Sequence, residues 1–162
     1  MVFLNPELDP LSAGYNIIQS KIAIGSGGLD GKGLTKGTQS YLSFLPEHQT
    51  DFIFACLSEE LGFIGGMFLL IIFFLIIYYS LIISINSRST FGKLVAAGVT
   101  SMFFCHIFIN IGMVTGLLPV VGIPLPFISY GGTMIGSMLI GIGLIMNVHI
   151  HQNVNINKGS YL

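Results

Sequence analysis

The chain has 162 residues, a net charge of −1, a mean hydropathy of +0.84 and only 8% charged residues. Soluble domains carry about 25% charged residues, so this composition predicts an integral membrane protein and argues against a nucleic-acid partner. All seven acidic residues lie at or before position 60, so the chain divides into a polar, acidic first third and an apolar remainder.

Residues 1–50 form a polar segment that prolines and glycines interrupt, and we expect a long loop there. Between Gly14 and Ile24, apolar residues recur with a roughly helical period, which predicts a short amphipathic helix along the membrane surface. The glycine cluster that follows lacks the Ser or Thr that a nucleotide-binding loop has after its Lys. Its backbone amides, with Lys32 and Lys36, instead form a hypothetical site for a lipid pyrophosphate.

Three uncharged apolar runs follow, and each is long enough to cross a hydrocarbon core of about 30 Å. We expect spanning helices at residues 61–85, 94–118 and 127–148, within a membrane region 51–148, and a tail at 149–162. Two pairs of glycines spaced four apart, Gly62/Gly66 and Gly132/Gly136, predict close helix packing.

Two polar residues, His106 and Asn110, lie one turn apart in the second run. Either they hydrogen-bond across to another helix or they line a polar cavity, and the sequence leaves both interpretations open. The two cysteines, Cys56 and Cys105, lie in apolar surroundings without the spacing of a metal site or a disulfide, and we expect buried thiols.

The basic residues near the spans predict the orientation. Arg88 and Lys93 lie in the first connection, and Lys158 lies in the tail. Because positive residues favour the cytoplasmic side, we expect this connection and the C-terminus inside and residues 1–50 outside the membrane.

Asp51 stands at the border between the two parts of the chain. Thr50 is a good N-cap residue, which places Asp51 in the first turn of a helix leading into the first span. Asp51 is therefore either a capping residue or a catalytic carboxylate. Glu59 and Glu60, close to the membrane interface, must be paired or solvated.

Nearly the whole chain resembles the C-terminal part of the SEDS family, its rod-shape members more than its division members. The resemblance is carried by motifs that occur in the family's order: Phe3-Leu4-Asn5-Pro6-Glu7, Gln19-Ser20-Lys21-Ile22-Ala23-Ile24-Gly25-Ser26-Gly27-Gly28, Phe44-Leu45-Pro46-Glu47, Thr50-Asp51-Phe52-Ile53-Phe54-Ala55, Glu59-Glu60-Leu61-Gly62 and Pro124-Leu125-Pro126-Phe127-Ile128-Ser129-Tyr130-Gly131-Gly132.

The resemblance implies an all-α membrane protein of about ten helices that polymerises lipid II into peptidoglycan strands for cell elongation. It implies the bacterial cytoplasmic membrane and a class B penicillin-binding protein as partner. Asp51 matches the family's essential aspartate and would be the general base. The residues expected to bind substrate are Lys32, Lys36, Glu47, Gln49, Thr50, Ser129 and Tyr130. No metal-binding residues are predicted; the cofactor stays open, with a divalent cation such as Mg²⁺ under consideration.

Two departures from the family pattern affect this interpretation. Gln49 stands where the family usually has His, so a proton relay there is in doubt. The family's N-terminal half has no counterpart in the chain, so we expect a truncated chain that is not active alone. The alternatives are a component of a lipid II flippase and a non-catalytic assembly partner or remnant.

Overall fold

The computed structural model describes residues 13–33, 36–37 and 50–152, and this part of the chain contains helices and connecting loops but no strand. The helices are α1 (Ala13–Gly27), α3 (Ile53–Asn86), α4 (Thr90–Val114) and α5 (Gly132–Ile150). Among the described residues, α3, α4 and α5 are long and apolar enough to cross a membrane. The predicted all-α integral membrane fold with three spans is therefore confirmed.

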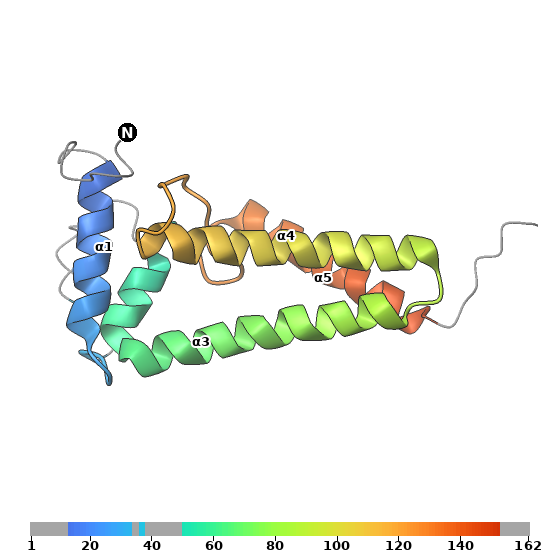
Figure 1. The fold of residues 1–162 in the computed structure, drawn as a ribbon, viewed down its shortest axis with the longest axis horizontal. Coiled ribbons are helices and arrows are strands. Elements are labelled where there is room, and N and C mark those ends of the chain that lie inside the picture. Colours follow the sequence, from blue (N-terminus) through green and yellow to red (C-terminus); the bar gives the residue numbers. More distant parts are fainter. Residues whose placement is uncertain (1–12, 34–35, 38–49, 153–162) are drawn as a thin grey trace, which may run out of the picture.

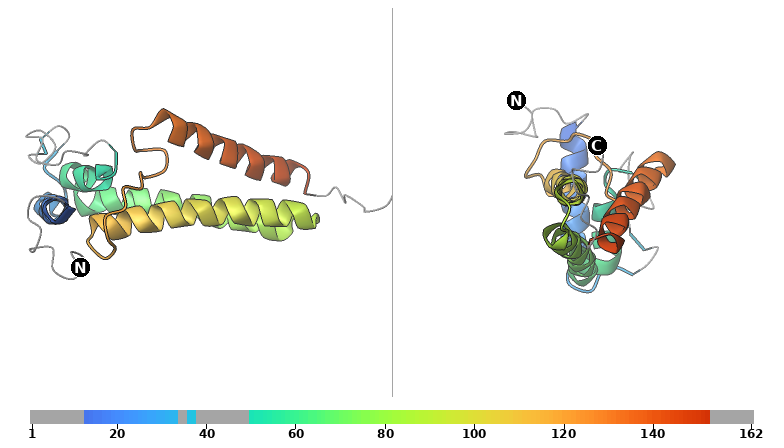
Figure 2. Two further views of the ribbon diagram at one scale, coloured as in Figure 1. Left: turned by 90° about the horizontal axis from the view of Figure 1, so that it is seen from above. Right: turned by 90° about the vertical axis from the view of Figure 1, so that its right-hand side faces the viewer.

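The three long helices run lengthwise, and α1 crosses one end of them (Figure 1). α3 and α4 are antiparallel and pack along each other, and α5 returns beside α4 (Figures 1 and 2). The connection between α3 and α4 and the end of α5 lie at the end opposite α1. The helix α1 and the charged connection are therefore separated by the length of the spans.

The helix α1 confirms the helix predicted between Gly14 and Ile24. It is tied to the end of α4, because the Ser20 hydroxyl donates to the Val114 carbonyl oxygen at 2.8 Å and lies at the same distance from that of Ile17. Ser20 is fully buried. This contact fixes the crossing helix against the spans.

The helix boundaries differ from the predicted spans, and at α4 local capping interactions mark both ends. α4 begins at Thr90, where the Ser89 side chain accepts a hydrogen bond from the Gly92 amide, and it ends at Val114 instead of 118. Gly116, at φ +75°, reverses the chain just beyond the helix, and the Leu117 amide closes the end by donating to the Gly112 carbonyl. α5 begins at Gly132 instead of 127.

The longest helix, α3, begins at Ile53, before the predicted span, and contains a break at Gly62, whose φ and ψ are 69° and −167°. The short segment before the break turns away from the rest of the helix (Figure 1). The predicted helix leading into the first span is therefore broken at Gly62.

The break frees backbone groups that the loop after α1 binds. The Lys32 and Gly33 amides donate to the Glu59 and Glu60 carbonyls at 3.1 and 3.0 Å. On the other side of the break, the Phe63 and Ile64 amides donate to the carbonyls of residues 28 and 29 at 2.9 and 3.3 Å. Buried backbone groups must be paired, so this loop stabilises the break.

The glycine pairs do not pack as predicted. A Cβ at Gly132 or Gly136 would meet nothing within 4 Å in the described part of the chain. At Gly62 the close neighbour is loop backbone, since a Cβ would lie 2.3 Å from the Gly31 nitrogen. A close contact between spans occurs instead at Gly141, whose added Cβ would lie 3.0 Å from a Val99 methyl.

The two cysteines also differ from each other. Cys56 is buried, as expected, whereas Cys105 is exposed on α4. The expectation for Cys105 is wrong because its face of α4 has no covering helix among the described residues.

Candidate functional site

Asp51 lies in a turn just before α3, and only 8% of it is exposed. The residue before the helix is Phe52, which makes no side-chain capping hydrogen bond. The prediction that Thr50 caps the helix and that Asp51 occupies its first turn is therefore wrong. The physical reason is that contacts from distant parts of the chain hold this turn.

The first of these contacts comes from Ser129, in the loop 115–131 between α4 and α5. Its hydroxyl donates to the Thr50 carbonyl oxygen at 2.6 Å and accepts from the Leu125 amide at 2.7 Å. Ser129 is 1% exposed. It was predicted to bind substrate, and the structure places it inside the protein as a link between the loop and the turn.

The second contact comes from Asn110 in α4. Its side-chain amide nitrogen, Nδ2, donates to the Asp51 carbonyl oxygen at 2.9 Å and to the Ile123 carbonyl oxygen at 2.7 Å. Asn110 therefore bonds across to backbone of a turn and a loop, rather than to a helix as one interpretation held. The Nδ1 atom of His106, one turn earlier, is buried and has no hydrogen-bond partner in the described part of the chain.

The carboxylate of Asp51 faces a glycine of the same loop. Gly122 has φ +71°, and a Cβ added to it would lie 3.1 Å from Asp51 Oδ2. A residue with a side chain would be strained at this φ and would crowd the carboxylate. The loop backbone therefore passes directly beside the acid, and glycine permits that approach.

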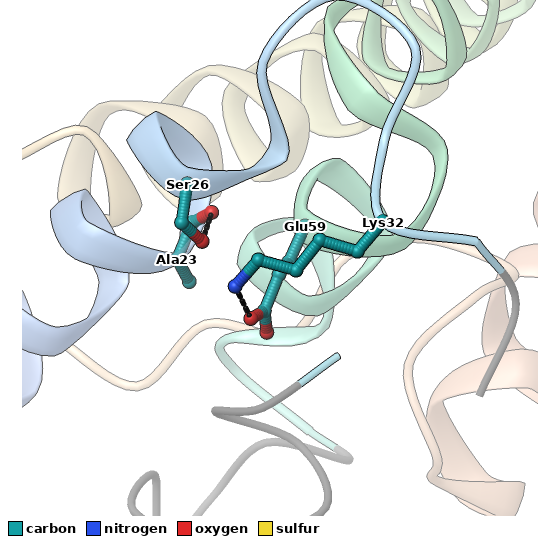
Figure 3. Close-up of polar contacts among 4 residues, drawn as sticks. All are labelled: Ala23, Ser26, Lys32 and Glu59. Atoms are coloured by element: carbon teal, nitrogen blue, oxygen red, sulfur yellow. Dashed lines mark hydrogen bonds and ion pairs between the residues drawn. The ribbon is translucent and has the colours of Figure 1, made fainter. Parts of the chain in front are cut away.

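A buried ion pair supports the segment that follows Asp51. Figure 3 shows Lys32 Nζ reaching Glu59 Oε1, at 2.6 Å; Glu59 is fully buried and the Lys32 side chain is 29% exposed. The prediction that Glu59 is paired or solvated is confirmed, and the structure shows that it is paired. The same view shows Ser26 bonded within α1 to the Ala23 carbonyl, at 2.9 Å.

The remaining predicted site residues differ in what the structure describes of them. Lys36 is exposed, and Tyr130 is 79% exposed. Glu47 and Gln49 lie outside the described residues. Within the described ranges, no group of three or more His, Cys, Asp or Glu side chains is placed to hold a metal ion, so a divalent cation stays a prediction.

Sequence reasoning did not identify Asn110 and Gly122 as neighbours of Asp51. The only sign of Asn110 was a lone amide in an uncharged span, which indicates a polar contact without naming the partner. Gly122 had no signal, because a glycine in a loop is expected whether or not an acid lies beside it.

Comparisons with known proteins give consistent matches. The model of the cell cycle protein family FTSW_RODA_SPOVE matches residues 1–154. The chain is 54% identical over 154 residues to the peptidoglycan glycosyltransferase MrdB of Escherichia coli K12, covering 95% of this chain and 42% of MrdB. It is 50% identical over 146 residues to the stage V sporulation protein E of Bacillus subtilis 168, covering 90% of this chain and 40% of that protein.

The fold matches as well. A chain from a solved structure concerned with the structural coordination of polymerization and crosslinking by a peptidoglycan synthase complex aligns with a TM-score of 0.77 and 28% identity. The alignment covers 95% of this chain and 41% of that chain. The chain thus spans about two fifths of the length of the proteins that it matches.

Proposed function

Because this chain belongs to the cell cycle protein family of FtsW, RodA and SpoVE, also called SEDS, we propose that it is part of a peptidoglycan glycosyltransferase and carries its catalytic aspartate, Asp51. The observation that supports this most is the position of Asp51 at one end of the membrane helices, beside a glycine at which an added side chain would crowd its carboxylate. A lipid-linked sugar presents its head group at such an interface.

The proposed role of Asp51 is general base. Its carboxylate accepts the proton of an acceptor sugar hydroxyl while that oxygen attacks the anomeric carbon of lipid II. The bond from that carbon to the lipid pyrophosphate breaks, and the pyrophosphate leaves with the bonding electrons. A positioned general base accelerates such a step by about 10²–10⁴-fold.

The substrate, membrane and partner belong to the same proposal. The chain spans the bacterial cytoplasmic membrane, with α1 and the turn at Asp51 on the outer side and the α3–α4 connection on the cytoplasmic side. Lipid II is the substrate, and a class B penicillin-binding protein is the partner that crosslinks the product. Lys36 and Tyr130, both exposed, are the predicted substrate contacts that the structure leaves accessible.

The test measures glycan strands made from labelled lipid II. The chain is assayed alone and as a chimera in which it replaces the matching part of Escherichia coli MrdB, its 54% identical relative. Asp51→Asn keeps the shape of the side chain and removes its basicity, so strand synthesis should fall at least about 100-fold. Glu60→Gln, at a half-buried acid in α3, is the matched control and should leave synthesis intact.

Two results would contradict this proposal. Strand synthesis that survives Asp51→Asn would remove Asp51 from catalysis. Transfer of labelled lipid II across vesicles by the same preparations, without strands and without need of Asp51, would instead support the flippase alternative.

A further inference from the structure

Residues 50 and 51 lie outside any helix, yet their backbone is enclosed. Thr50 is half-buried and Asp51 buried, in the turn that precedes the start of α3 at Ile53. A buried carbonyl requires a hydrogen bond. Here both are met by side chains that are distant in sequence: Ser129 on the Thr50 oxygen and Asn110 on the Asp51 oxygen.

These two oxygens belong to the two peptide planes that flank the Asp51 Cα atom. Each peptide unit is rigid, so holding the carbonyl of residue 50 and that of residue 51 restricts the rotation on both sides of this Cα. Restricting these two rotations also fixes the direction of the Asp51 Cα–Cβ bond, from which the carboxylate extends. The hydrogen bonds therefore act on the orientation of Asp51 and not only on the stability of the loop.

Asn110 also holds the loop segment that faces the Asp51 carboxylate. Its second Nδ2 bond goes to the carbonyl of Ile123, next to Gly122, which lies against Asp51 Oδ2. One side-chain amide thus sets the position of the aspartate backbone and of the loop beside the carboxylate.

The chemistry of the amide makes this assignment specific. Two carbonyl oxygens face the same atom, so that atom must be the NH₂ group, and both of its hydrogens are used. The other end of the amide, Asn110 Oδ1, is buried without a hydrogen-bond partner in the described part of the chain. An unpaired buried oxygen costs free energy, and only a two-hydrogen donor of this shape serves both carbonyls.

We propose that Asn110 and Ser129 are positioning residues for Asp51, which they hold through the two peptide units on either side of it. The inference depends on the proposed role of Asp51, but the effect of the two side chains on the backbone around Asp51, called the hold below, can be measured without any activity. The two are therefore tested separately.

The hold is measured on this chain by hydrogen exchange of the backbone amides. Asn110→Asp keeps the shape but places oxygens against two carbonyls, and Ser129→Ala removes the hydroxyl. Each should speed exchange in residues 50–55 and 120–125 while leaving the middle of α3 unchanged. The matched controls are Thr100→Val and Ser80→Ala, because both residues are buried and, among the described residues, their hydroxyls bond within their own helix.

The positioning effect is measured in whichever preparation, the chain alone or the MrdB chimera, makes glycan strands from labelled lipid II. A misplaced catalytic group can cost about 100-fold in rate, so kcat should fall by that order in Asn110→Asp while KM for lipid II stays unchanged. In the Asp51→Asn background the same substitution should cause no further loss, because the group that it positions is already inactive.

Specific results would overturn the inference. It fails if exchange and kcat of both variants match those of the controls, or if exchange rises evenly over the whole chain, which indicates general unfolding. If Ser129→Ala alone folds, its local exchange and its kcat decide the question. Activity that survives Asp51→Asn refutes the proposed function instead, and the exchange data still show whether the hold exists.

Discussion

Replacing Gly62 with alanine should break the junction that carries the Asp51 segment. At φ 69° and ψ −167°, Gly62 occupies a region that glycine alone adopts readily, and a side chain there costs about 1–3 kcal/mol. The new Cβ would also lie 2.3 Å from the Gly31 nitrogen and 2.5 Å from the Leu29 carbonyl oxygen, so the loop must move away.

The magnitude follows from the bonds that the loop makes at the break. Four backbone hydrogen bonds join it to α3, two on each side of Gly62. At roughly 0.5–1.5 kcal/mol each, losing half of them adds about 1–3 kcal/mol to the backbone strain. We therefore expect Gly62→Ala to destabilise the protein by about 2–6 kcal/mol, the sum of the two ranges.

The assay is thermal unfolding of the purified chain in detergent, together with limited proteolysis of the segment before Gly62. Gly98→Ala is the matched control, because Gly98 lies within α4 and a Cβ there would meet no described atom within 4 Å. The control should unfold at the wild-type temperature or above it, since alanine favours a helix more than glycine does. A Gly62→Ala protein with unchanged Tm and unchanged cleavage would refute the account of the break.

Two further predictions concern the ion pair and the orientation. Lys32→Ala should destabilise the protein more than Glu59→Gln, because it removes the ammonium group from beside a fully buried carboxylate. The double variant should regain part of the lost stability. Equal melting temperatures for the two single variants would contradict this. The loss of stability in Lys32→Ala should stay below the roughly 3–5 kcal/mol expected when a fully buried ion pair is broken, since Lys32 is 29% exposed. The orientation is tested in a cysteine-free background with an impermeant maleimide, added to intact cells that lack an outer membrane barrier. The reagent should label Val121→Cys, at a position that is 60% exposed, but not Asn86→Cys. The reverse labelling pattern would invert the proposed topology.

The sequence by itself determined the class of the protein, its three spans, the helix before them and its family. These properties depend on local patterns: an apolar run long enough for a membrane, a helical period between Gly14 and Ile24, and motifs in a fixed order. The need of Glu59 for a partner also followed, because a carboxylate near the hydrocarbon must be paired or solvated. Its partner, Lys32, did not follow.

Only the tertiary structure decided how Asp51 is held. The hydrogen bonds that fix its turn come from Asn110 and Ser129, 59 and 79 positions away from the residues that they hold. Such contacts leave no period or composition in a sequence, and they outweighed the local capping signal at Thr50. The same is true of the break at Gly62, since a glycine permits an unusual backbone conformation but does not reveal whether a neighbouring loop will stabilise it.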